Sequence, residues 1–476
     1  MKKLKIFSAI LAGAVACGVF TGCKPKNNRV DVTGTIVIEP FANSSFGISW
    51  IEKMAANWKE ETGSNFKVLV KKNSTALSGT QLETMETSNT DIFFGAECMY
   101  NSGFYKGYFE DLTEFLDEKP DGENGLTVRE KIADYDKWKK VSSIVKYNKP
   151  ADGTKNPYDS QYFSYEGCYM LPYSTTLTGM LYDHELFVDA GLMAYAENTN
   201  EVKSALTAQG ITYEVDDVED LLIFKSSTKE TNYNAGDAIL TAGKDGKYGT
   251  YDDGLPATYD EFFVLCDKMK GDVTPFIWSG QFGKAYMNYL FSALYADYEG
   301  SEVKTAFDFN GTLTHIVESV NGDVVEFKPA TEINNENGYL AFKSAGYYYS
   351  LKFVERMLSD TDYYSANLNS NAHSHTQAQI DYVLSEFDQK FNQNGKPIAM
   401  LVEGSYWENE AKDYGVFDRV KKYGKSAADC RYAYMPVPKV SEELVGTKCT
   451  TGEGLGNISF ISSKIAPEKV DLAKKF

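Results

Sequence analysis

Apolar and polar residues follow two different periods along this chain, which predict strands and helices in turn. Residues 35–38 and 66–70 are short β-branched or alternating stretches typical of strands. Between them, apolar side chains recur every three or four positions, which predicts a helix over residues 48–61 that ends at Gly63. A further helix and the strand 91–94 follow. This order of elements is typical of an α/β fold with a mainly parallel sheet.

The rest of the chain predicts more elements of both kinds. Thr258 with Glu261, and Ser405 with Glu408, have the spacing of a capping box, so each pair marks the start of a helix. The other predicted helices are 127–140, 285–298 and 347–358. The predicted strands are 169–172, 179–182, 273–277, 396–402, 431–436 and 456–461.

Two segments depart from this regular pattern. Residues 193–255 are acidic, polar and weakly periodic, which indicates an insertion with its own small fold or a partly ordered loop. Residues 467–476 begin an amphipathic helix that has no terminal glycine or capping residue. We therefore expect the chain to be a fragment that lacks its native C-terminus.

The N-terminus has the layout of an export signal. Three lysines precede an apolar run over residues 6–20, and small residues lead to Cys23. The site resembles a bacterial lipobox, which implies a signal peptide over 1–22, a lipidated Cys23 and a tether over 23–33. Alternatively, Cys23 is incidental to an ordinary signal peptide, and a cut before Cys17 is a weaker rival.

Charge narrows the range of partners and locations. The formal charge of −19 becomes −22 when the three lysines of the signal are removed. Such an acidic protein repels phosphate backbones, so we expect no nucleic-acid partner. No other apolar stretch is long enough to span a bilayer. We expect a body outside the cytoplasmic membrane, held at the cell surface or periplasmic face by its lipid anchor only.

Motifs of metal and enzyme chemistry are absent from the sequence. The cysteines show no CxxC or Cys/His spacing, which argues against zinc and favours buried free thiols, with disulfide pairing left open. There is no G-x-S-x-G, H-E-x-x-H or P-loop motif. His373 and His375 flank Ser374 in a stretch that we interpret as a solvated loop rather than a metal site.

Eight stretches in a fixed order resemble one family. They are 50–66 (WIEKMAANWKEETGSNF), 91–95 (DIFFG), 108–112 (YFEDL), 168–192 (CYMLPYSTTLTGMLYDHELFVDAGL), 256–262 (PATYDEF), 398–411 (IAMLVEGSYWENEA), 434–438 (YMPVP) and 466–476 (APEKVDLAKKF). Together with the lipobox, they resemble the family 1 extracellular solute-binding lipoproteins of ABC importers, which include maltose-binding protein. The resemblance covers nearly the whole mature chain.

That resemblance implies a two-lobed α/β fold of type II, in which the lobes close over a ligand in the cleft between them. It assigns 34–175 plus 405–455 to the first lobe. The second lobe takes 180–402 plus 459–476, with the insertion at 193–255.

Candidate ligand-binding residues follow the strands, because open α/β sheets bind ligands beyond the carboxyl ends of their strands. Aromatic rings, acids, amides and hydroxyls gather there, and a sugar needs this mixture. The resemblance gives Tyr406 and Trp407 the position of a stacking aromatic, and at most one of these neighbours can face the cleft fully. The full set is Glu39, Glu97, Tyr100, Thr175, Trp278, Gln281, Glu403, Tyr406 and Trp407.

A second constellation lies in the stretch 243–254 (GKDGKYGTYDDG). Asp245, Asp252 and Asp253, together with backbone carbonyls, offer oxygen ligands for a structural calcium ion. The stretch lacks the alternating spacing of an EF-hand loop, and a Gly/Asp-rich turn explains it equally simply.

The sequence therefore predicts a monomeric, non-catalytic binding lipoprotein that needs no cofactor beyond the optional calcium. It captures a mono- or oligosaccharide and delivers it to the permease subunits of an ABC transporter. Two alternatives remain open: a binder of another solute or a sensor subunit of the same fold, and a surface glycoside hydrolase, whose paired carboxylates sequence cannot identify.

Overall fold

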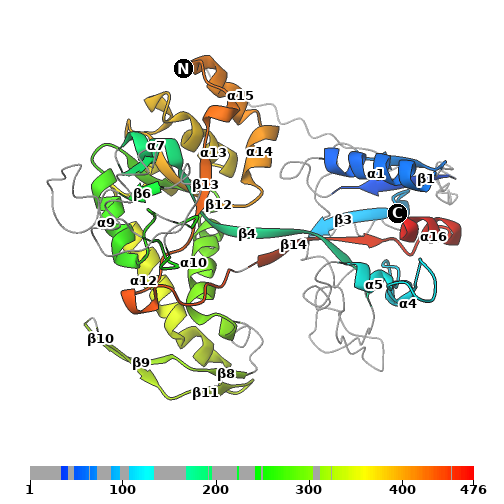
Figure 1. Cartoon of the computed structure of the whole chain (residues 1–476), viewed down its shortest axis with the longest axis horizontal. Helices are drawn as coiled ribbons and strands as arrows, with labels where there is room; N and C mark the ends of the chain where they lie inside the picture. The colour runs from blue at the N-terminus through cyan, green and yellow to red at the C-terminus, as the bar shows by residue number, and fades with distance from the viewer. Residues whose placement is uncertain are drawn as a thin grey trace, which may run out of the picture.

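The structure is a computed structural model of the whole chain (Figure 1). It describes residues 34–40, 48–63, 65–71, 87–96, 107–132, 168–190, 192–195, 222–224, 242–247, 250–252, 254–303, 311–322, 324–451 and 453–476.

One mixed sheet of eight strands runs through the molecule and is covered by two separate groups of helices (Figure 1). Its order is β2 (Lys67–Val70), β1 (Thr35–Glu39), β3 (Ile92–Ala96), β14 (Glu453–Ile461), β4 (Leu171–Asp183), β12 (Ile398–Gly404) and β7 (Thr274–Ile277), with β13 (Tyr432–Met435) also paired to β4. The fold is the predicted two-lobed α/β architecture. The first lobe holds the described residues up to 177 and from 453 onward, and the second lobe holds those between.

The first lobe packs around β1, which pairs in parallel with β2 and β3. Helix α1 (Ser49–Thr62) buries Ile51 and Ala55 one turn apart against this sheet. The helix ends at Gly63, whose φ of 63° is left-handed, as the sequence predicts. Helix α16 (Pro467–Lys475) adds Leu472 to the same core.

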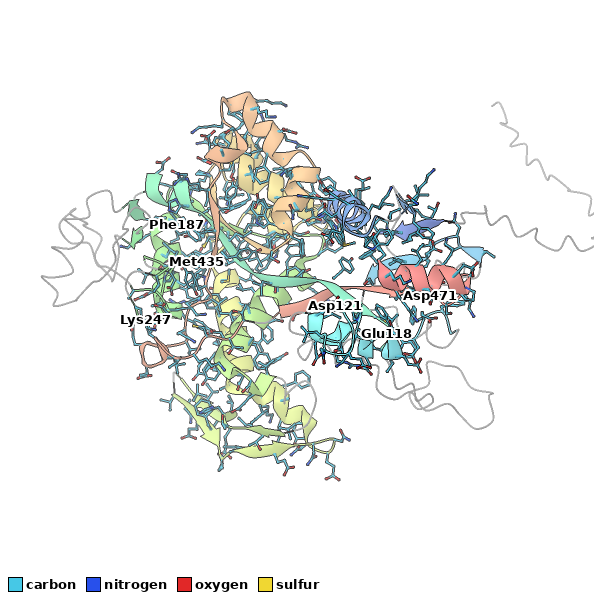
Figure 2. All side chains as sticks on the ribbon, turned by 45° about the vertical axis from the view of Figure 1, so that its right-hand side comes forward. Glu118, Asp121, Phe187, Lys247, Met435 and Asp471 are labelled. Carbon is cyan, nitrogen blue, oxygen red and sulfur yellow. The ribbon has the colours of Figure 1, made fainter. Side chains whose placement is uncertain are left out.

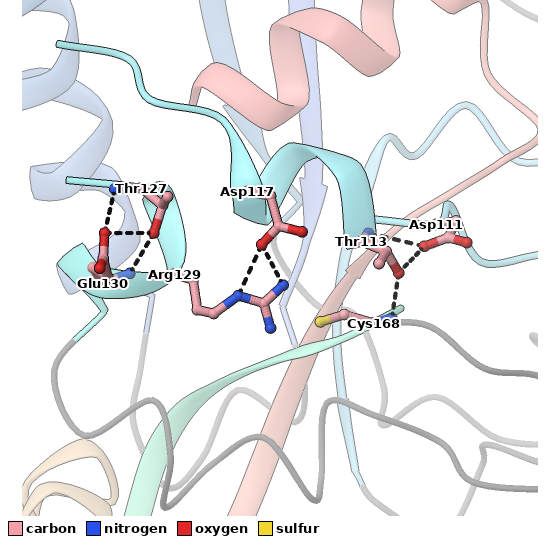
Figure 3. Close-up of polar contacts among 7 residues, drawn as sticks. All are labelled: Asp111, Thr113, Asp117, Thr127, Arg129, Glu130 and Cys168. Atoms are coloured by element: carbon pink, nitrogen blue, oxygen red, sulfur yellow. Dashed lines mark hydrogen bonds and ion pairs between the residues drawn. The ribbon is translucent and has the colours of Figure 1, made fainter. Parts of the chain in front are cut away.

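Polar contacts fasten the two short helices of this lobe, α4 (Thr113–Asp117) and α5 (Val128–Lys131) (Figure 3). The Arg129 guanidinium donates to Asp117 Oδ1 at 2.7 Å and so joins the helices. The Thr113 hydroxyl accepts from the backbone N–H of Cys168 at 2.8 Å, just before β4 begins. The crossing strand is therefore fixed at its first-lobe end.

The second lobe is larger and is built on β4, β7, β12 and β13. Its core includes Phe187 and Met435, whereas Asp121 and Asp471 belong to the first lobe (Figure 2). Its α-helices are α7 (His184–Asp189), α9 (Tyr259–Met269), α10 (Gly283–Glu299), α12 (Ala345–Ser359), α13 (His375–Leu384), α14 (Trp407–Asp413) and α15 (Val416–Arg419). Its 3-10 helices are η3 (Gly338–Lys343), η4 (Ala366–Asn369), η5 (Gln389–Phe391), η6 (Val420–Tyr423), η7 (Ala427–Asp429) and η8 (Glu442–Leu444).

Three antiparallel pairs of short strands lie outside the main sheet. Within the stretch 193–255, β5 (Met193–Tyr195) pairs with β6 (Leu222–Phe224). Below α10 and α12 in Figure 1, β8 (Gly311–Leu313) pairs with β11 (Thr331–Ile333), and β9 (Ile316–Asn321) pairs with β10 (Val324–Lys328). The sequence did not predict the four strands between residues 311 and 333.

Strand β4 is a single strand of 13 residues, where the sequence predicts two separate ones. It pairs with β14 as far as Leu177 and with β12 from Thr178 onward. The prediction of two strands was wrong because Pro172 and the polar run after it interrupt the apolar pattern. Backbone pairing with β14 up to Leu177, and with β12 and β13 beyond it, keeps β4 extended regardless of its side chains.

The lobe assignment of the last quarter of the chain needs correction. Residues 405–455 were expected in the first lobe, but Trp407 packs with Leu181 and Ile277 in the second. Residues 459–476 were expected in the second lobe, but they form part of the first. The reason is the pairing of β14 with β3. The chain therefore returns from the second lobe to the first only where β14 begins, at Glu453.

The four described cysteines are all free. Cys168 and Cys266 are buried, in line with the sequence prediction, whereas Cys449 is exposed.

The two leucines Leu401 and Leu69 test this assignment of the core. Leu401 in β12 is 0% exposed and Leu69 in β2 is 51% exposed. We expect Leu401→Ala to lower the free energy of unfolding by about 2–5 kcal/mol, because it leaves a cavity between packed layers. Leu69→Ala is the matched control and should change it by less than about 0.5 kcal/mol in urea unfolding. Equal losses would contradict the assignment.

Candidate functional site

The carboxyl ends of the parallel strands in the two lobes point toward each other. Strand β4 runs from the first lobe into the second, and β12 is antiparallel to it, so β12 and β7 run toward the first lobe. Strand β3 is antiparallel to β14, which is antiparallel to β4, so β3 runs toward the second lobe (Figure 1). Ligands of open α/β sheets bind at such ends.

Three helices of the second lobe begin together where β12 ends. Helix α10 begins after Phe282, α13 begins at His375, and α14 begins after Tyr406. The rings of Phe282 and His375 lie 5.9 Å apart between their centroids. Backbone N–H groups at helix starts favour negative charge and hydrogen-bond acceptors, and the acid at the centre of this arrangement is Glu403.

The Glu403 carboxylate is completely buried and accepts three hydrogen bonds. The Tyr286 hydroxyl donates to Oε1 at 2.8 Å, and Gln379 Nε2 donates to the same oxygen at 3.1 Å. The backbone N–H of Gly404 donates to Oε2 at 2.8 Å. A buried carboxylate is tolerated only with such partners, so Glu403 organises its surroundings.

The network continues outward through Gln379. Its Nε2 also donates to Glu410 Oε2 at 2.7 Å, so one amide bridges two buried carboxylates. The Glu410 Oε1 atom lies 3.3 Å from His375 Nε2, and this hydrogen bond raises the pKa of His375. Burial, with the charge of Glu410 as a smaller cause, raises the pKa of Glu403 to about 7.

Partly exposed aromatic rings surround this network. The half-buried Tyr406 places its hydroxyl 3.3 Å from that of Tyr289. The rings of Tyr289 and Tyr286 lie 5.1 Å apart, and Phe282 is 46% exposed. Burial raises the pKa of the Tyr406 hydroxyl, which therefore stays neutral and available as a donor.

The turn after β12 is bonded to the strand that joins the lobes. The backbone N–H of Ser405 donates to the carbonyl of Leu177 at 2.8 Å, and the N–H of Leu177 donates to the Ser405 hydroxyl at 3.2 Å. Ser405 therefore bonds to Leu177 and does not form the capping box predicted with Glu408. Helix α14 begins only at Trp407 and has no side-chain cap. Tyr406 is thus one residue from the crossing point.

A cavity of about 470 Å³ lies beside the same turn. Aromatic and charged side chains from α14, α15, η6 and β13 line it together with Ser405. Cavities of this size accommodate small molecules in other proteins. The aromatic residues that line the cavity are Trp407, Phe417, Tyr432 and Tyr434, and the charged ones are Glu408, Lys412, Asp418 and Lys421.

The first lobe has its own aromatic cluster, formed by Trp50, Phe94 and Tyr173. Trp50 stacks on Tyr173 at 5.7 Å between centroids, and Phe94 meets Tyr173 edge-on at 4.6 Å. Phe94 is buried, whereas Trp50 and Tyr173 are half-buried. They come from α1, β3 and β4, so this cluster sits on the strands that lead toward the second lobe.

Several predicted ligand residues have other roles in the structure. Trp278 is 2% exposed and packs on Phe276 in the core. Trp407 is 3% exposed and meets Tyr382 and Tyr432 edge-on. Both indoles are therefore largely covered by protein, although Trp407 also lines the 470 Å³ cavity, and their contact with a solute stays a prediction.

The remaining predicted residues are distributed over both lobes. The Glu39 carboxylate accepts from Lys71 Nζ at 2.9 Å and from the Thr90 hydroxyl at 2.8 Å. Its hydrogen bonds are thus to other residues of the first lobe. Gln281 is exposed before α10, and its N–H donates to the carbonyl of His373. Only the backbone of Thr175 is described, in β4. Cys23, Glu97, Tyr100 and Asp253 lie outside the described residues.

Sequence reasoning missed the residues that organise Glu403. His375 was assigned to a solvated loop and Gln379 was not singled out, but both lie on one face of α13, four positions apart. That i, i+4 spacing behind Ser374, which accepts from the N–H of Gln377, is the signal that identifies the helix.

The predicted calcium ligands form contacts within their own loop. The Asp252 carboxylate accepts from the Thr250 hydroxyl at 2.7 Å, and Asp245 accepts from the N–H of Lys247 at 2.7 Å. Within the described ranges, no three His, Cys, Asp or Glu side chains are grouped to hold a metal ion.

No protein-family model and no curated protein matches this chain. Among solved structures, it is similar to a chitin oligosaccharide binding protein with 14% identity and a TM-score of 0.44, over 93% of this chain and 75% of that one. It is also similar to the apo-form of RafE from Streptococcus pneumoniae, with 12% identity and a TM-score of 0.43, over 93% and 76%. Both TM-scores are below 0.5, so the function is inferred from the site itself. No helix among the described residues is long and apolar enough to cross a membrane.

The raised pKa of Glu403 predicts a pH-dependent stability. The unfolded carboxyl loses its proton near its usual value of 4.5, and the folded one near 7. Its contribution to stability is complete below pH 4.5 and is lost as the pH rises to 7, by an amount on the order of a few kcal/mol. Glu403→Gln should remove this part of the pH profile in urea unfolding between pH 5 and pH 8.

The matched control is Glu318→Gln, which changes an exposed carboxylate in β9. Other buried acids make the wild-type profile steeper in the same direction, because burial also raises the pKa of Glu299 and Glu386 to about 7. The measured quantity is therefore the difference between each variant and the wild type. Parallel profiles for Glu403→Gln and wild type would contradict the prediction.

Proposed function

We propose that this protein is an extracellular substrate-binding lipoprotein of an ABC importer, which captures a carbohydrate between its lobes and delivers it to the permease. One observation carries the proposal: the strands of both lobes end facing each other, on either side of the strands that connect the lobes. Residues at these ends contact one solute from two sides when the lobes approach.

The side chains near these ends suit a sugar. A sugar presents a C–H face that packs on an aromatic ring, and hydroxyls that need hydrogen-bond partners. Tyr406 and Tyr289 in the second lobe, and Tyr173 in the first, combine a ring with a hydroxyl. The charged and aromatic lining of the adjacent 470 Å³ cavity adds further partners.

The connection between the lobes allows a hinge motion. Strand β4 changes its partner between Leu177 and Thr178. A change of φ and ψ in one or two residues there rotates one lobe without disturbing either core. Closure places the solute between Tyr406 and the aromatic cluster of the first lobe.

A non-catalytic role fits the arrangement of the two buried acids. Glycoside hydrolases place two separate carboxyl groups on either side of the scissile bond. Glu403 and Glu410 instead share the Nε2 of Gln379, and both are buried behind the aromatic rings. They hold the binding surface in position. Hydrolysis of chromogenic glycosides that is lost on Glu403→Gln would contradict this role.

Lipid attachment at Cys23 completes the proposal. Several acyl chains on one cysteine give firm anchoring, at about 0.8 kcal/mol per buried CH2. The acidic body then works as a monomer beside the transporter, outside the cytoplasmic membrane.

Ligand binding is tested first by thermal shift against panels of sugars, amino acids and peptides. We expect saccharides to raise the melting temperature. Tyr406→Ala should weaken the affinity for the best saccharide by about tenfold, or ~1.4 kcal/mol, because a stacking face is lost. Tyr339→Ala, which changes a tyrosine 63% exposed on η3, is the control and should bind as the wild type does. Stabilisation by peptides alone would overturn the carbohydrate assignment.

The anchor is tested separately in cells. Cys23→Ser should release the protein from the membrane fraction into the soluble or culture fraction, because the acceptor of the lipid is gone. Cys17→Ser removes the rival cysteine and should leave the protein in the membrane fraction. Release by Cys17→Ser instead would place the cleavage site there.

A further inference from the structure

The position of the Tyr406 ring depends on the short turn between Glu403 and Tyr406. Gly404 has no side chain, and the Tyr406 ring lies directly against it: a Cβ there would be 2.3 Å from Tyr406 Cε1. The Glu403 carboxylate holds the N–H of this same glycine. A movement of Glu403 is therefore expected to move Gly404 and, with it, the Tyr406 ring.

The contacts of Glu403 suit its ionised form. Three groups donate to its two oxygens: the hydroxyl of Tyr286, the amide of Gln379 and the N–H of Gly404. A proton on Oε2 faces the N–H of Gly404, and two donors cannot share one hydrogen bond. A proton on Oε1 displaces Gln379 or forces the Tyr286 hydroxyl to turn. Protonation therefore either breaks the contact with Gly404 or rearranges the contacts of Tyr286 and Gln379 with the same carboxyl group.

Burial, with the charge of Glu410 as a smaller cause, makes protonation of Glu403 accessible near neutral pH. Glu410 shares the Gln379 amide with it, and His375 is the basic side chain bound to this network. The other titratable groups that interact with it are neutral tyrosines, namely Tyr286 from α10, Tyr406 before α14 and Tyr434 from β13. Gln379 Oε1 is buried without a hydrogen-bond partner among the described residues, so no spare donor reaches this side of the network.

We propose that Glu403 is a positioning residue for Tyr406, and that proton uptake by Glu403 releases the turn and weakens solute capture. The effect on capture rests on the proposed function, whereas the effect on the Tyr406 ring does not. Ionised Glu403 keeps the ring in its binding position. Acidification in the neutral range loosens it, so the protein releases its solute more readily in an acidic environment.

The movement of the ring is tested without any solute. With 3-fluorotyrosine placed at position 406, the fluorine resonance should shift between pH 8 and pH 6 with a midpoint near 7, following Glu403. In Glu403→Gln the resonance should stay constant across this range, near its wild-type position at low pH. Near-UV circular dichroism at both pH values shows whether this variant keeps a folded core.

His375→Gln separates the two titrating groups. If Glu403 is responsible, the shift of the fluorine resonance persists in this variant. Loss of the shift in His375→Gln, or a shift that persists in Glu403→Gln, overturns the proposal. Should Glu403→Gln not fold, a wild-type resonance that is constant from pH 8 to pH 6 overturns it equally.

The effect on solute capture is measured with the saccharide that gives the largest thermal shift. If only the ionised form binds, the apparent Kd rises up to about tenfold from pH 8 to pH 6, because about a tenth of the protein is then competent. Glu403→Gln should bind weakly and independently of pH, whereas Glu318→Gln should follow the wild type. A Kd that is constant over this range in the wild type contradicts the effect on capture. If no saccharide binds, the carbohydrate function fails, while the fluorine experiment still decides the role of Glu403.

Discussion

The structure depends above all on the backbone hydrogen bonding of one strand. Strand β4 pairs with β14 in the first lobe and with β12 and β13 in the second, and its change of partner falls beside Leu177. Because backbone groups in an extended strand must be paired, each edge of β4 recruits strands from distant parts of the chain. The direction of β4 then fixes the directions of β3 and β12, and so makes their carboxyl ends face each other.

The site follows from this constraint together with the cost of burying charge. Residues at the end of β12 lie against the starts of α10, α13 and α14, where backbone N–H groups and side-chain donors converge. A carboxylate is stable there only when donors surround it, and Glu403 has three. These bonds give Tyr406 a defined position at the surface. The same bonds make that position sensitive to a single proton.

Hinge and site are coupled because they share residues next to each other in sequence. Ser405 binds Leu177 at the crossing, and its neighbours Gly404 and Tyr406 belong to the site. A movement of the turn therefore reaches both the Tyr406 ring and the strand that connects the lobes. Under the proposed function, solute binding and lobe closure are therefore coupled directly through this turn.

The sequence by itself determined the local features: helix α1 with its end at Gly63, the start of α9 at Thr258, the apolar strand β12 and the aromatic pair behind it. These depend on neighbours within a few positions. It could not determine which lobe holds residues 405–455, that Trp278 and Trp407 are buried, or that Ser405 binds β4 instead of capping a helix. Ser405 and Leu177 are 228 positions apart, and such partners are chosen by the packing of the whole sheet. The tertiary structure decided the site because burial and hydrogen bonding between distant residues, rather than residue type, give Glu403 and Tyr406 their roles.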